Sequence, residues 1–253
     1  HLPPFSEQER IVRLLDEAET LRRLRARADE RTAELIPAIF HQMFGDPATN
    51  ERGWPLVEVS SFVRQFQGGR SILTEGSENS QSEYRVLKVS AVTWKDYRPR
   101  ESKPVPPNYV PQEHHLVRAG DLLFSRANTT ELVGATAYVF ETPPNMLLPD
   151  KLWRFVWREP QTVDPLFVWS LFLHKSVRRE LGQRATGTGG SMKNISMPKA
   201  LSMSVPHPPL SLQREFAARV ASFDKFRTLQ AQSKARLEAL FEAMLARAVA
   251  GEL

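Results

Sequence analysis

Two stretches, one at each end of the chain, share the same pattern of apolar and polar positions. Residues from Pro3 resemble residues from Pro208 at a constant offset of 205, and both begin with Pro-Pro-x-Ser-x-Gln. Apolar or small residues then recur with alternating spacings of four and three, which is typical of a coiled-coil seam. The predicted seam of the first stretch is Ala18, Leu21, Arg25, Ala28, Thr32, Leu35 and Ile39, and that of the second is Phe223, Phe226, Gln230, Ser233, Leu237, Leu240 and Met244.

Both stretches are predicted to be long helices of roughly 30 residues, or roughly 45 Å at ~1.5 Å per residue. Ser6 and Ser211 are the predicted N-caps, because a serine oxygen can accept a hydrogen bond from a first-turn amide. Pro37 predicts a kink or a break in the first helix. A lone helix with such a seam must bury it. Antiparallel pairing of the two is the simplest solution, and the alternative is two unrelated helices that pack on the middle of the chain.

Between the two helices the pattern changes to short β-rich runs separated by Pro and Gly. The predicted strands are 56–63, 85–92, 121–125, 134–140, 152–157 and one near 200–205, and a helix is predicted over 164–181. The fold class is therefore predicted as α+β, with one mixed domain flanked by two long helices. We place the domain boundaries at 1–47, 48–207 and 208–253.

Positive charge is concentrated in the middle segment. The net charge of +5 in the whole chain matches the excess of 20 Lys/Arg over 15 Asp/Glu in residues 48–207. Residues 174–199 alone hold six basic residues and one acidic residue. Such a stretch suits a polyanion such as DNA, and the alternative is a solvated helix face. There is no cysteine, which fits a reducing cytosol.

Several short sequences resemble catalytic motifs but lack residues that those motifs require, so we predict no catalytic, metal or cofactor site. The run 187–193 resembles a phosphate loop, but a true loop needs Gly before the Lys and Ser or Thr after it. Met192 and Asn194 occupy those places. His114 and His115 are adjacent, so in a strand they would point to opposite faces and would not share a metal.

Three polar loops are better candidates, for binding DNA. Glycine-rich backbone, hydroxyls and Lys can grip phosphates, while Arg and Asn can pair with guanine and adenine edges. A structural salt bridge for Arg126 and a turn role for Asn128 are the alternatives. The predicted DNA-binding residues are Arg64, Arg70, Arg126, Asn128, Thr129, Arg184, Thr186, Thr188, Ser191, Lys193 and Asn194.

In their order along the chain, these features resemble the specificity subunit of type I restriction–modification enzymes. The resemblance covers nearly the whole chain. It rests on the repeated Pro-Pro-x-Ser-x-Gln helix, on Gly-Asp-Leu-Leu-Phe-Ser-Arg at 120–126, and on the run 186–196 that leads into 205–210. Members of that family usually carry two target-recognition domains, whereas this chain has both helices but one such domain. We therefore expect the C-terminal part of a full subunit, or a half-subunit that dimerises.

The resemblance implies a non-catalytic subunit that reads one half of a bipartite double-stranded DNA target and docks methyltransferase subunits. A restriction subunit and a second copy of the chain are further expected partners. S-adenosylmethionine, ATP and Mg²⁺ are expected on partner subunits only, and the location is expected to be cytoplasmic, with no membrane partner. The alternatives are a coiled-coil interaction adaptor, or degenerate half-subunit, that no longer reads DNA, and a nuclease or methyltransferase fragment.

Overall fold

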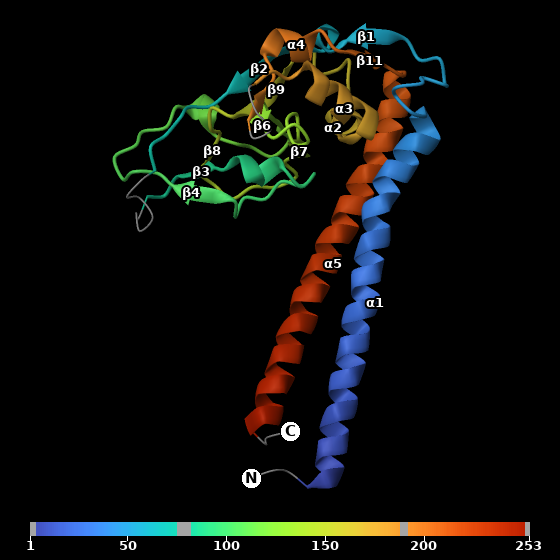
Figure 1. The fold of residues 1–253 in the computed structure, drawn as a ribbon, viewed down its shortest axis with the longest axis vertical. Helices are drawn as coiled ribbons and strands as arrows, with labels where there is room; N and C mark the ends of the chain where they lie inside the picture. Colours follow the sequence, from blue (N-terminus) through green and yellow to red (C-terminus); the bar gives the residue numbers. More distant parts are fainter. Residues whose placement is uncertain (1–3, 75–81, 188–191, 251–253) are drawn as a thin grey trace. The chain divides into compact units, whose positions relative to one another are not determined.

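The computed structural model describes residues 4–74, 82–187 and 192–250 (Figure 1). It divides into two compact units, residues 1–39 with 218–253 and residues 40–217. The first unit is helical and the second holds every strand of the described residues. The predicted α+β class, with a mixed domain flanked by two long helices, is confirmed. Among the described residues, no helix combines the length and apolarity needed to cross a bilayer.

The two long helices are α1 (Phe5–Phe44) and α5 (Leu210–Ala250). They run antiparallel, because the guanidinium of Arg22 lies 4.9 Å from the ring centre of Phe241, whereas Phe40 contacts Phe216 at the opposite ends of the same helices (Figure 1). The predicted pairing is confirmed. The predicted break at Pro37 is wrong, since α1 continues through this proline. Pro37 is exposed, so water can satisfy the carbonyl that loses its partner there.

Several of the residues predicted for the coiled-coil seam are partly buried in the helix pair, and others are exposed. Ala18, Arg25 and Ile39 on α1 repeat at Phe223, Gln230 and Met244 on α5, all partly buried. The other predicted row is wrong in part, because Leu35 and Leu240 are exposed and their neighbours Ile36 and Phe241 are partly buried instead. The predicted seam residues that the structure leaves exposed are Leu21, Leu35, Phe226, Ser233 and Leu240.

The repeated Pro-Pro-x-Ser-x-Gln motif at the start of each helix has a different role from the one predicted. The first helical hydrogen bonds are accepted by the carbonyls of Pro4 and Pro209, at 3.0 Å from Gln8 N and 3.2 Å from Gln213 N. The serines therefore lie inside the first turn, and their prediction as N-caps is wrong. Gln213 instead is fully buried, where its Nε2 donates to the Pro208 carbonyl at 2.8 Å and its Oε1 accepts from Asp164 N at 2.9 Å.

Within residues 40–74, 82–187 and 192–217, the second unit contains four small sheets (Figure 1). The largest has the order β2-β9-β5-β7, all antiparallel, and a second has the order β4-β3-β8. Two further pairs are β1 with β11 and β6 with β10. The strands are β1 (Leu56–Glu58), β2 (Val63–Gly68), β3 (Arg85–Leu87), β4 (Ser102–Pro104), β5 (Leu122–Ser125), β6 (Ala127–Asn128), β7 (Thr136–Tyr138), β8 (Met146–Leu147), β9 (Leu152–Trp157), β10 (Lys193–Asn194) and β11 (Ser204–Pro206).

Several predicted elements are shorter than expected. In the predicted strands at 56–63 and 85–92, three-residue strands are followed by 3₁₀ turns, Val59–Ser61 and Val89–Val92, and Val63 already belongs to β2. The predicted helix over 164–181 is two helices, α2 (Pro165–Leu173) and α3 (Lys175–Arg184). His174 separates them with extended backbone, and its ring lies 2.8 Å from the Ser176 hydroxyl. The predicted strand near 200–205 begins later, because α4 (Met197–Leu201) precedes β11.

A cluster of aromatic residues packs on the large sheet in the interior of the second unit. Phe66, Phe124 and Phe155 lie within 4.8–6.0 Å of one another on the large sheet. Phe172 of α2 packs on Phe155 at 5.2 Å, so α2 covers this sheet. Burying such rings supplies large apolar area, with additional edge-to-face attraction. These ring contacts therefore stabilise the large sheet, from which the neighbouring loops extend.

Candidate nucleic-acid interface

Two of the predicted DNA-binding segments, far apart in sequence, are hydrogen-bonded neighbours. The chain leaves β5 at Ser125, passes Arg126 and forms β6, which pairs antiparallel with β10. Lys193 lies opposite Asn128, and Ile195 N donates to the Arg126 carbonyl at 2.9 Å. The pairing therefore brings Arg126, Asn128, Lys193 and Asn194 to one patch, which we call the β6–β10 patch.

The glycine-containing loop joins this patch from the end of α3. Thr186 and Asn194 exchange two backbone hydrogen bonds of 2.8 Å, and Lys193 Nζ donates to the Gly187 carbonyl at 3.0 Å. Gly187 has φ +153°, and a Cβ there would lie 2.3 Å from the Met192 carbonyl oxygen. Only glycine permits so close a crossing of the two chain segments. Thr188 and Ser191, both predicted site residues, lie outside the described residues.

Arg126 is held in a fixed orientation beside a carboxylate. Its Nε donates to the Asp150 carbonyl at 2.9 Å, and its Nη2 lies 3.8 Å from Asp150 Oδ2. The guanidinium also stands 5.9 Å from the ring centre of Trp153. The ion pair that the sequence offered as an alternative is thus present. About a third of the Arg126 side chain remains exposed, and an oriented, partly exposed guanidinium retains donors for a base edge or a phosphate.

Asn128 and Thr129 also make local contacts. Asn128 Oδ1 accepts from Thr129 N at 2.9 Å, and the Thr129 carbonyl accepts from Leu132 N and Val133 N at 3.1 and 2.8 Å. The turn role weighed for Asn128 is therefore seen. Both side chains remain partly exposed next to β10.

Arg70 and Arg64 lie at opposite ends of one strand. β2 runs antiparallel to β9, with Gly68 opposite Trp153 and Val63 opposite Trp157. Gly69 N donates to the Pro149 carbonyl at 3.1 Å, so the exposed Arg70 follows at the Trp153 end, where Arg126 also lies. Arg64 is exposed within β2 near the other end, so its predicted position on a loop is wrong. The structure does not bring Arg64 to the β6–β10 patch.

Arg184 has a structural role that the sequence did not reveal. Its Nε and Nη2 lie 2.9 and 2.7 Å from Glu180 Oε1, one turn earlier in α3. Its Nη1 donates to Ser202 Oγ at 3.2 Å, which ties α3 to the end of α4. These contacts engage most of the guanidinium, and a DNA contact by Arg184 stays a prediction.

Charged groups nearer the core are satisfied within the fold. Arg154 Nη1 lies 3.4 Å from Asp121 Oδ1 with both side chains largely buried, and its Nη2 donates to the Leu116 carbonyl at 2.8 Å. Burial raises the pKa of Asp121 against the opposing effects of the Arg118 amide and the Arg154 charge. Within the described residues, no group of three or more His, Asp or Glu is arranged to hold a metal ion.

The sequence and the fold were compared with known proteins. No family model matches the sequence. The chain is 27% identical over 196 residues to the type I restriction enzyme EcoEI specificity subunit of Escherichia coli. That match covers 76% of this chain and 32% of the relative, so the chain spans about a third of the curated relative's length.

Solved structures of such subunits share the fold. The S subunit of a type I restriction–modification system from M. genitalium has a TM-score of 0.61 at 12% identity, with 96% of this chain and 61% of that chain covered. A chain from a type I restriction–modification system studied for complex assembly and conformational transition has a TM-score of 0.56 at 22% identity, over 100% of this chain and 61% of that one. The resemblance is therefore confirmed: the chain is similar in sequence to a type I restriction enzyme specificity subunit, and it shares the fold of a solved S subunit of such a system.

Proposed function

We propose that this chain is a DNA-reading subunit or half-subunit of a type I restriction–modification complex, and that it recognises one half of a bipartite target. The observation that carries the proposal is the pairing of β6 with β10. It places an oriented Arg126, a partly exposed amide at Asn128 and the cation of Lys193 on one patch that follows β5 of the large sheet. These are the donor types that read base edges and hold phosphates.

The two cations of the patch have different expected roles. Arg126 is fixed by Asp150 and Trp153, and a planar guanidinium can pair bidentately with guanine O6 and N7. Lys193 is a point charge suited to phosphate. Arg126→Ala should therefore relax base preference, whereas Lys193→Ala should weaken binding to all sequences alike and reduce the salt dependence by about one contact.

The test is fluorescence anisotropy on the chain with a methyltransferase subunit, using one duplex that carries the selected site and one that does not, over a series of salt concentrations. Lys103→Ala, an exposed strand lysine on the β4-β3-β8 sheet, is the matched control. The site assignment is wrong if both patch variants bind the two duplexes as the wild type does.

Repeated apolar residues on the long helices support docking of a protein partner. Leu21, Leu24 and Leu35 of α1 are 52, 56 and 39% exposed, and their counterparts at an offset of 205 on α5 are 51, 64 and 57% exposed. These counterparts are Phe226, Leu229 and Leu240. Because the helix pair does not bury these side chains, a partner that covers them would gain roughly 25 cal/mol per Å² of apolar area.

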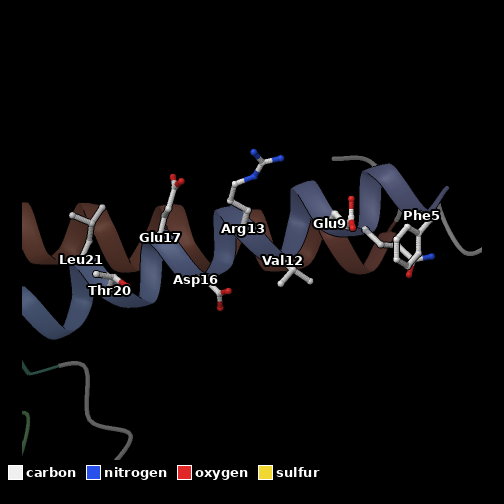
Figure 2. A pocket seen from close by; sticks show the side chains of 9 residues that line it. Phe5, Glu9, Val12, Arg13, Asp16, Glu17, Thr20 and Leu21 are labelled. Atoms are coloured by element: carbon white, nitrogen blue, oxygen red, sulfur yellow. The ribbon is translucent and has the colours of Figure 1, made fainter.

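The N-terminal part of α1 continues this exposed surface. Phe5 and Val12 are 74 and 57% exposed and line a shallow depression along the helix. Figure 2 shows Val12 and Asp16 on one flank of the helix and Arg13 and Glu17 on the other. Apolar side chains between charged ones are typical of a protein interface with a polar rim.

We assign this surface to methyltransferase subunits, which the similar complex-forming system supports. Leu24→Asp combined with Leu229→Asp should reduce co-purification of the methyltransferase subunit at least tenfold while helicity is retained. Ala26→Asp, an exposed change about 200° around the helix from Leu24, is the control. Undiminished co-purification of the double variant would assign the docking surface elsewhere.

The remaining parts of the proposal follow from this assignment. A second copy of the chain would supply the other half of the recognition site, and a restriction subunit would join through the methyltransferase subunits. S-adenosylmethionine, ATP and Mg²⁺ would bind these partners, and the chain itself would contribute no catalytic group. We propose a cytoplasmic location because the DNA partner is found there.

A further inference from the structure

A basic cavity in the second unit shares none of its lining residues with the β6–β10 patch. It has a volume of about 620 Å³ and is bounded by α3, by residues 130–136 and by the turn at 93–95. Four of its lining residues are basic, Lys95, Lys175, Arg178 and Arg179, whereas Glu131 is its one acidic lining residue within the described chain. A hollow with this excess of cations attracts anions.

Arg178 provides a desolvated donor at this cavity. Its Nη2 donates to the Glu131 carbonyl at 2.7 Å, while its Nη1 is buried without a hydrogen-bond acceptor among the described residues. Burial lowers the pKa of Arg178 to about 10, so the side chain stays charged at neutral pH. A buried charged donor with no acceptor is costly, and an anion that accepts from it removes this cost.

Gly134 makes room for this arginine. It has φ +77°, and a Cβ there would lie 2.8 Å from Leu181 Cδ1 and 3.4 Å from Arg178 Nη1. The close approach of the β5–β7 connection to α3 therefore depends on glycine. The position of Arg178 therefore depends on the backbone conformation at Gly134.

Thr136 adds a second buried polar group to the same cavity. It lies on β7 opposite Phe124, is fully buried, and its Oγ1 has no hydrogen-bond partner in the described part of the chain. Thr93 and Thr130 also line the cavity. Hydroxyl donors and guanidinium donors together suit an anion with several acceptor oxygens more than a simple halide.

We propose that this cavity binds a phosphate group, carried either by a free nucleotide or by the DNA backbone. A phosphate in the cavity can accept from the exposed cations Lys95 and Arg179, and Arg178 and Thr136 line the same cavity. The apolar residues Leu132 and Leu173 leave a hydrophobic wall for a sugar or base. The volume is within the usual range for small-ligand sites, roughly 300–1,000 Å³. The inference does not depend on sequence-specific reading of DNA.

The test is calorimetric titration of the full chain with inorganic phosphate, with adenosine monophosphate and with a short duplex DNA. Lys95→Ala combined with Arg179→Ala changes two exposed side chains and should weaken phosphate-bearing ligands at least tenfold. Thr136→Val keeps the side-chain volume and removes only a hydroxyl without a partner, so it should weaken binding several-fold while the melting temperature does not fall. Lys103→Ala, which removes one positive charge outside the cavity, is the control, and its binding should match the wild type.

The outcomes distinguish a free nucleotide from the DNA backbone as the carrier of the phosphate, and they test the proposal. Binding of the mononucleotide, in competition with phosphate, supports a free nucleotide even if the chain shows no sequence preference for DNA. Binding of DNA alone, weakened by Thr136→Val and by the double variant but not by Lys103→Ala, supports a backbone phosphate. Equal losses in the double variant and in Lys103→Ala, or wild-type binding by Thr136→Val, would overturn the proposal.

Discussion

Gln213 is predicted to be the side chain that fixes the start of α5 to the recognition unit. It is fully buried, donates to the Pro208 carbonyl and accepts from Asp164 N, which belongs to the N-cap residue of α2. Gln213→Ala removes both hydrogen bonds and leaves the Pro208 carbonyl buried without this partner. Each lost bond costs about 1 kcal/mol, and an unsatisfied buried group adds about 1–3 kcal/mol. We therefore expect the free energy of unfolding to fall by about 3–5 kcal/mol.

Tryptophan fluorescence during urea unfolding measures this change selectively, because all five tryptophans lie within residues 40–217. Gln213→Met, which keeps most of the volume, separates the hydrogen bonds from the packing, and it should lose most of the same stability. Gln183→Ala, at an exposed position of α3, is the control and should change stability by less than about 0.5 kcal/mol. A Gln213→Ala variant with an unchanged urea midpoint would refute the reasoning.

Two further predictions concern the loop and the histidines. Gly187→Ala should weaken DNA binding with little change in global unfolding, because its Cβ would lie 2.3 Å from the Met192 carbonyl oxygen and displace the loop from β10. Fluorescence anisotropy measures the DNA affinity, and an affinity equal to that of the wild type would contradict the prediction. Burial lowers the pKa of His115, His174 and His207, so the fold favours their neutral forms. The stability that the three neutral histidines contribute is fully present above about pH 6.5 and is lost as the pH falls through their lowered pKa values. The melting temperature should therefore drop between pH 7.5 and pH 5. A melting temperature that does not change over this range would contradict the prediction.

The sequence was sufficient to predict the helix pair because a long periodic repeat is a local signal. It did not predict every buried position, since whether Leu35 or Ile36 is the less exposed residue depends on how the two helices pack against each other. It also did not predict the separation of α2 from α3, because nothing in the apolar spacing reveals that His174 caps the second helix. Gln213 is part of the repeated motif, but its buried hydrogen bonds depend on Asp164, which lies 49 residues away.

The candidate site was likewise predicted only in part from the sequence. The loops around Arg126 and Lys193 were predicted from composition, but their pairing through β6 and β10 joins residues 65 positions apart and has no local signature. The structural use of Arg184 and the distant position of Arg64 also required the tertiary fold. The basic residues of the phosphate cavity belong largely to the basic stretch at 174–199, yet only the fold places Lys95 and Thr136 beside them.

The central claim is that this chain reads DNA sequence through the β6–β10 patch. Its most direct measurement is selection of duplexes from a random-sequence library by the chain together with a methyltransferase subunit, followed by sequencing. We predict enrichment of one short motif or of two such motifs at a fixed spacing, and loss of defined positions within it when Arg126 is replaced by alanine. Recovery of duplexes without any common sequence would contradict the claim.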